Sequence, residues 1–133
     1  MLCATAAWAQ QADSTAFKGY LYNKEYDVYM RINFYEQDVI ISWQDLLGPL
    51  PGFLAKHGTT YTWIVNAAEV EGNTARLEII NDYASEDLQA TLKQTNDSTF
   101  ILKQLEGSTI KFPEKSKWLK LPKSLTFIKQ RER

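Results

Sequence analysis

Apolar and polar residues alternate between residues 26 and 43, and this pattern predicts two β-strands joined by a turn at residues 36–38. In the first strand the apolar set is Tyr26, Val28, Met30, Ile32 and Phe34, and the opposite set is Asp27, Tyr29, Arg31, Asn33 and Tyr35. In the second strand the apolar set continues with Val39, Ile41 and Trp43. Strands with one apolar and one polar side are typical of an antiparallel sheet that has one packed and one solvated face.

The same alternation predicts further strands at residues 16–22, 60–70, 74–80, 87–94, 99–104, 109–112, 118–121 and 125–129. Within residues 60–70 the apolar parity changes from Trp63 and Val65 to Ala68 and Val70, as a β-bulge would produce. Short turns join most of these strands. We therefore expect an all-β fold, an antiparallel up-and-down meander of eight to ten strands closed into a barrel.

Residues 44–58 interrupt the alternation. Gly48, Pro49, Pro51 and Gly52 fall close together there, and these residue types disfavour a regular central strand. We expect an irregular surface loop with at most a short helical turn at residues 54–57. Because long irregular loops often carry function, residues 48–53 are a candidate cover for a binding site.

The length of 133 residues is that of a single domain. Ala7, Trp8 and Ala9 match the small-x-small pattern that a signal peptidase reads. Residues 1–9 are therefore predicted to be the remnant of a signal peptide, residues 10–15 a flexible mature N-terminus and residues 16–130 a single β-barrel domain. Cys3 leaves a lipoprotein signal open as an alternative. Either signal predicts a secreted or periplasmic protein, and no later apolar run approaches the roughly 18 residues of a transmembrane segment.

Charge is distributed unevenly along the chain, because residues 1–110 hold 7 basic and 14 acidic residues and residues 111–133 hold 8 basic and 2 acidic ones. A basic end can attract an anionic partner, or its lysines can protect a sheet edge from pairing with another chain. The lysines alternate with apolar residues, which favours edge protection. Trp118, which stands between Lys117 and Lys120, is predicted to plug the core.

The arrangement of strands, together with the segments EYDVYMR at 25–31, LGPLPGF at 47–53 and WLKLPK at 118–123, resembles the small exported lipocalin-like (calycin-type) β-barrel proteins of Gram-negative bacteria. Many proteins of that kind have no assigned activity. The resemblance implies a lipocalin-like barrel over roughly residues 16–129. It implies no site residues, because the Gly-x-Trp signature of true lipocalins is absent and Gly19 is followed by Tyr20 and Leu21.

Catalytic motifs are absent from the sequence. His57 is the only histidine, and it lies outside any Gly-x-Ser-x-Gly or His-Glu-x-x-His pattern, so a solvated or capping role is favoured. Acidic pairs such as Glu69 and Glu71 occur on most soluble sheets and are not specific for a hydrolase. There is no phosphate-binding glycine loop and no basic-aromatic signature of an RNA-binding module. We expect no enzyme activity, no cofactor, no metal site and no nucleic-acid partner.

The barrel interior is the remaining candidate site, because an eight-strand barrel either is filled by its own side chains or holds one small ligand. The predicted ligand-binding residues, under the loop at 48–53, are Tyr26, Met30, Trp43, Phe53 and Trp63. They would make this a non-enzymatic binding protein that holds a small apolar or amphipathic ligand at the barrel mouth. The alternative is a side-chain-filled barrel that binds a protein or another component of the cell envelope.

Overall fold

The computed structural model describes residues 15–43, 48–81 and 85–130. The predicted signal-peptide remnant at residues 1–9 and nearly all of the predicted flexible segment at 10–15 lie outside the described residues. So do residues 44–47 of the predicted loop. Among the described residues no helix is long and apolar enough to cross a membrane.

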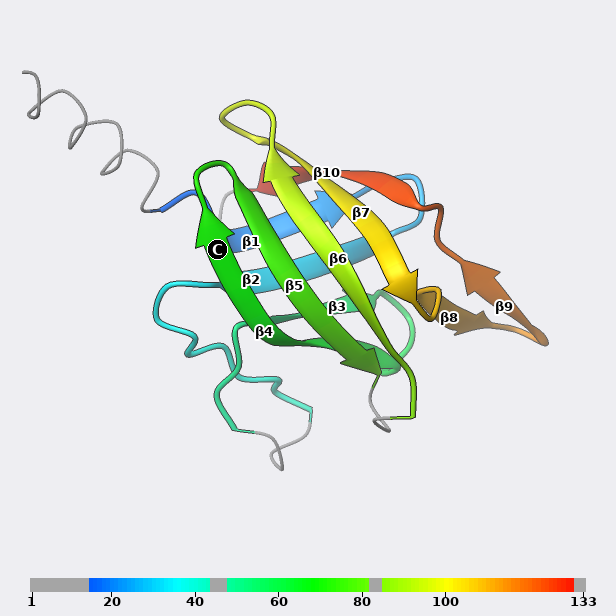
Figure 1. The fold of residues 1–133 in the computed structure, drawn as a ribbon. Helices are drawn as coiled ribbons and strands as arrows, with labels where there is room; N and C mark the ends of the chain where they lie inside the picture. Colours follow the sequence, from blue (N-terminus) through cyan, green and yellow to red (C-terminus); the bar gives the residue numbers. More distant parts are fainter. Residues whose placement is uncertain (1–14, 44–47, 82–84, 131–133) are drawn as a thin grey trace, which may run out of the picture.

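The described chain forms ten β-strands and no helix, as the alternation predicts. Their bounds are β1 Lys18–Asn23, β2 Val28–Asn33, β3 Gly52–Lys56, β4 Thr62–Glu71, β5 Thr74–Asn81, β6 Asp87–Gln94, β7 Thr99–Gly107, β8 Lys111–Glu114, β9 Lys117–Lys120 and β10 Ser124–Gln130. Eight of them close into an antiparallel barrel in the order β1-β10-β7-β6-β5-β4-β3-β2, and β8 and β9 form a separate hairpin (Figure 1). The expected closed meander is thus confirmed.

Alternation decides which side chains enter the barrel. In β2 the interior positions are Val28, Met30 and Ile32, all buried, and the outward positions are Tyr29 and Arg31. Four residues predicted to face the interior are confirmed by membership of one buried cluster, namely Met30, Ile32, Phe34 and Trp63. The predicted phase change in β4 is also confirmed, because its register with β5 shifts between Val65 and Ala67.

The predicted strand over residues 39–43 is wrong. These residues form only an isolated bridge between Val39 and Leu50, and they cross the outside of the barrel instead of joining its sheet. Ile41 is fully buried there against the outward side chains of β3 and β4, including Phe53 and Ile64. The alternation of this segment therefore reflects packing onto the barrel from outside. Trp43, predicted to point inward, is 40% exposed.

The predicted loop and helical turn over residues 48–58 are also wrong where β3 begins, at Gly52, and continues to Lys56 between β2 and β4. Pro51 precedes the strand, and its carbonyl oxygen accepts a hydrogen bond from the Asn33 amide at 2.9 Å. A Cβ on Gly52 would lie 2.6 Å from the Arg31 carbonyl oxygen. The glycine therefore permits a close approach of two central strands and does not mark a loop.

Candidate binding surface

The structure does not bring the five predicted ligand-binding residues together. Met30 and Trp63 are fully buried in the barrel interior, and Tyr26 packs partly buried against that core. Phe53 is buried in a second cluster on the outer side of the sheet, and Trp43 covers it from outside with ring centroids 5.4 Å apart. The barrel wall thus separates the two groups.

Large side chains occupy the barrel interior. The most voluminous fully buried ones are Trp63, Phe17, Phe100, Phe112, Phe127, Leu21 and Met30. The indole Nε1 of Trp63 donates a 2.8 Å hydrogen bond to the Lys111 carbonyl oxygen, so its polar atom is satisfied inside the core. Three hollows open to solvent are lined by described residues, and the predicted five residues line none of these three. A ligand at the mouth stays a prediction without support from these hollows.

The outward side chains of β1 and β2 instead form an aromatic surface. We call Tyr20, Tyr22, Tyr29 and His57 the aromatic face. Register places Tyr22 directly opposite Tyr29, and it places Tyr20 opposite Arg31. His57 follows β3, and its ring stacks on Tyr29 with centroids 4.7 Å apart and planes 25° apart. Alternation directs the three tyrosine rings away from the core, and they are half-buried, whereas His57 in the turn after β3 is exposed.

Close ring contacts connect this surface. Tyr20 lies 5.5 Å from Tyr29 and 6.4 Å from Tyr22 between centroids. The guanidinium carbon of Arg31 lies 4.7 Å from the Tyr20 ring centroid, within the range of a cation–π contact. These contacts restrict the rotamers of side chains that would otherwise move freely, so the surface is largely pre-organised.

Asp27 holds one end of the aromatic face. Its Oδ1 accepts a hydrogen bond from the Tyr22 hydroxyl at 2.7 Å and lies 2.7 Å from Nδ1 of His57. Because an ionised carboxylate only accepts, Nδ1 of His57 carries the hydrogen and Nε2 is the ring nitrogen that can engage a ligand. Asp27 adopts φ of 57°, a left-handed conformation that aspartate tolerates better than most residues.

Hydrogen bonding and burial shift the pKa values of Asp27, Tyr22 and Tyr29. The contact with His57, followed by that with Tyr22, lowers the pKa of Asp27 below its ordinary value. The hydrogen bond that the Tyr22 hydroxyl donates to Asp27 raises the pKa of Tyr22, and burial raises the pKa of Tyr29. At neutral pH the carboxylate is therefore charged, and both phenols keep the hydrogen with which they can donate.

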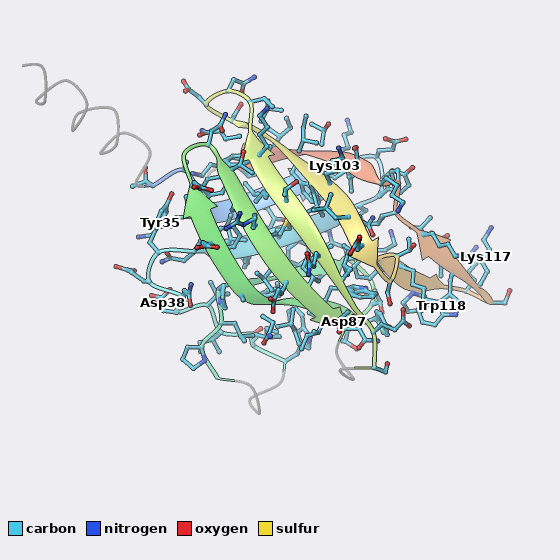
Figure 2. All side chains as sticks on the ribbon, in the orientation of Figure 1. Tyr35, Asp38, Asp87, Lys103, Lys117 and Trp118 are labelled. Carbon is cyan, nitrogen blue, oxygen red and sulfur yellow. The ribbon has the colours of Figure 1, made fainter. Side chains whose placement is uncertain are left out.

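A polar hollow of about 600 Å³ adjoins the aromatic face. Its lining includes six charged or amide side chains, namely Lys18, Arg31, Asn33, Glu36, Asp38 and Lys129. The Asn33 amide Nδ2 donates to Glu36 Oε1 and to Asp38 Oδ1, both at 3.1 Å, which fixes the two carboxylates. Arg31 lines the hollow and also lies on the Tyr20 ring, so it joins the two parts. Figure 2 shows Asp38 on the side of the barrel away from Trp118.

The sequence contains the signal for this surface, because alternation places Tyr29 and Arg31 on the opposite, solvated side of their strand. Alternation alone predicts only that this side of the strand faces solvent. The missed indication was the presence of tyrosines at outward positions of two neighbouring strands, where lysine, glutamate or threonine would keep a surface soluble. Among the described residues no group of three or more His, Cys, Asp or Glu side chains could hold a metal ion.

No protein-family model matches this chain, and neither a curated protein nor a solved structure shows significant similarity to it. The resemblance to lipocalin-like exported proteins therefore stays a prediction. Arguments about function depend on the surface just described.

Proposed function

We propose that this protein is a non-enzymatic binding protein that holds a glycan on the aromatic face and in the adjoining polar hollow. The observation that carries the proposal is the position of Arg31, which contacts the Tyr20 ring and lines the hollow. One ligand could therefore touch rings and polar groups at the same time.

The chemistry of the surface favours a hydroxylated ligand. Aromatic rings offer an apolar area on which the C–H face of a sugar ring can pack, and tyrosine adds a hydroxyl at its edge. The hollow supplies cationic donors from Lys18 and Arg31 and carboxylate acceptors from Glu36 and Asp38. Hydroxyl groups both donate and accept, so a polyol can use both kinds of partner. A purely apolar molecule would leave these charges desolvated and unpaired.

The dimensions fit a ligand of more than one sugar unit. The hollow falls within the roughly 300–1,000 Å³ of typical ligand sites. Tyr22 lies four positions along β1 from Lys18, and a strand rises roughly 3.3 Å per residue, so the surface extends for about 13 Å along the strands. Export to the periplasm or beyond, as the N-terminal pattern predicts, would bring this surface to glycans of the cell envelope.

A protein partner is the second candidate. Ile128 on β10 lies opposite Tyr22 in the register and is 41% exposed, and Trp43 lies at the other side of the face beyond Phe53. Ile128 and Trp43 together extend the aromatic face into a band across four strands. Enrichment in aromatic residues and arginine is typical of the centre of protein interfaces.

Affinity electrophoresis through gels that contain galactomannan, xylan, mixed-linkage β-glucan or dextran tests the glycan proposal. We expect at least one polysaccharide to retard the wild-type protein. Tyr20→Ala and Arg31→Ala should each weaken that retardation roughly tenfold, because each removes a contact worth about 1 kcal/mol or slightly more. Arg76→Ala, which removes an exposed arginine on β5, is the matched control and should leave binding unchanged.

Migration of the wild-type protein unchanged in all four gels would contradict the glycan proposal. An equal loss of binding in Arg76→Ala would also contradict it, because the effect would then follow net charge and not this surface. Purified candidate partners would then be tested with Tyr22→Ser and Ile128→Ser variants, which should weaken a protein interface through the extended band.

A further inference from the structure

The β8–β9 hairpin is an insertion outside the barrel wall. It lies in sequence between β7 and β10, which pair directly with each other in the barrel. Figure 1 shows β9 standing away from the barrel beyond the end of β7. The hairpin therefore presents a surface that the barrel sheet does not use.

The base of the hairpin is firmly attached to the core. Phe112 is fully buried and joins the interior cluster together with Ile110 and Leu121. The buried side chain of Gln104 accepts a hydrogen bond from the Ile110 amide at 2.8 Å and donates to the Pro122 carbonyl oxygen at 3.0 Å. These contacts hold both ends of the insertion, so its outer strand has a defined orientation.

The hairpin and its flanks are strongly basic. From residue 111 to residue 123 there are five lysines, Lys111, Lys115, Lys117, Lys120 and Lys123, against the single acid Glu114. Register places Lys111 directly opposite Lys120, and like charges in that position repel. Glu86 lies 3.4 Å from the Lys111 ammonium and offsets part of this repulsion. The remaining lysines are exposed.

Trp118 lies among these lysines and is 47% exposed, so the prediction that it plugs the core is wrong. Phe112 and Leu119 form one cross-strand pair, and Pro113 and Trp118 form the next, which points to the opposite face. Phe112 therefore fills the core and Trp118 faces outward. Its ring contacts Tyr61 edge-on at 5.3 Å and lies 5.0 Å from the Lys111 ammonium. Figure 2 shows Lys117 and Trp118 at the hairpin side of the molecule.

We infer that the β8–β9 hairpin docks on the surface of an anionic phospholipid bilayer. Tryptophan is enriched at membrane interfaces, where its ring reaches the headgroup level while its N–H stays near water. Clustered lysines are attracted to anionic headgroups. Protection of a sheet edge from pairing would explain the lysines, but it would not explain an exposed tryptophan between them.

Vesicle co-sedimentation tests this inference with the full chain. The probes are phosphatidylcholine vesicles with and without phosphatidylglycerol, at low and high salt. Each lysine near an anionic surface contributes about fivefold in affinity. The triple variant of Lys115, Lys117 and Lys120 to Gln should therefore bind phosphatidylglycerol vesicles roughly a hundredfold more weakly at low salt. High salt should weaken binding of the wild-type protein, because it screens the attraction.

A matched triple variant, Lys24, Lys93 and Lys103 to Gln, removes the same charge from exposed positions outside the hairpin. It should retain most of the binding. Brominated lipids should quench part of the tryptophan emission of the wild-type protein, and Trp118→Phe should abolish that quenching.

Three outcomes would overturn the inference. The first is absence of binding to phosphatidylglycerol vesicles at low salt, and the second is an equal loss of binding in both triple variants. The third is salt-sensitive binding to an oligonucleotide that depends on the hairpin lysines, without any binding to vesicles.

Discussion

Gln104 provides the sharpest test of how the hairpin is attached. Its side chain is 5% exposed and bridges the chain on both sides of the β8–β9 insertion, at Ile110 and at Pro122. Gln104→Leu keeps a side chain of similar size but removes both hydrogen-bonding groups. The Ile110 amide, which belongs to a fully buried residue, then loses this acceptor. The Pro122 carbonyl belongs to an exposed residue, so water can replace the lost donor.

The cost follows from these two different environments. A buried N–H left without a partner costs about 1–3 kcal/mol, whereas a carbonyl that water can reach costs little. Burial of the apolar leucine atoms returns part of this loss. We therefore expect the free energy of unfolding to fall by about 1–2 kcal/mol. Gln89→Leu, at an exposed position on β6, should change it by less than about 0.5 kcal/mol.

Urea unfolding measures the global effect, and amide hydrogen exchange locates it. The amides of Ile110 and Leu121 should exchange faster in Gln104→Leu, since the Leu121 amide donates at 2.9 Å to the Ile110 carbonyl oxygen within the same attachment. Unchanged stability together with unchanged exchange at Ile110 would refute the reasoning, because the side chain would then not hold the hairpin.

Three further predictions concern other parts of the molecule. Asp27→Asn should be less stable than wild type at neutral pH, and the difference in stability should shrink as pH falls below about 4. The reason is that the lowered pKa of Asp27 stabilises the fold only while the carboxylate facing His57 is ionised. Urea unfolding across pH measures the difference, and a difference that does not change with pH would contradict the prediction. Gly52→Ala should lose about 1–3 kcal/mol by the same measurement, because its Cβ would lie 2.6 Å from the Arg31 carbonyl oxygen, and an unchanged stability would show that β2 and β3 can separate freely. Phe112→Ala should cost about 3–5 kcal/mol because the ring is fully buried, and a cost below about 1 kcal/mol would contradict the packing of this ring in the interior cluster.

Local patterns in the sequence predicted most of the barrel. Alternation located β1, β2 and β4 to β7 within a few residues, and it assigned Met30 and Trp63 to the interior. The phase change after Val65 located the bulge in β4. These predictions succeed because the inward side of a two-residue repeat must be apolar wherever the sheet packs on a core.

The same rule failed where apolar residues pack on the outside of the sheet. Alternation over residues 39–43 resembles a strand, yet Ile41 is buried because that segment lies over outward residues of β3 and β4. The glycine and proline residues before and at Gly52 predicted a loop, but this glycine instead allows two strands to approach closely. Burial outside the barrel and contact between backbones distant in sequence leave no distinctive local pattern.

The sequence by itself determined that this chain forms a closed antiparallel barrel, and it determined which residues of most strands face the core, because a period of two is a local property of the backbone. Only the tertiary structure decided that the predicted ligand residues lie on both sides of the barrel wall. Only the tertiary structure brought Tyr22 of β1, Asp27 of the β1–β2 turn and His57 after β3 within hydrogen-bonding or ring-contact distance. Such groupings depend on the register between strands, and that register is set by the packing of the whole barrel.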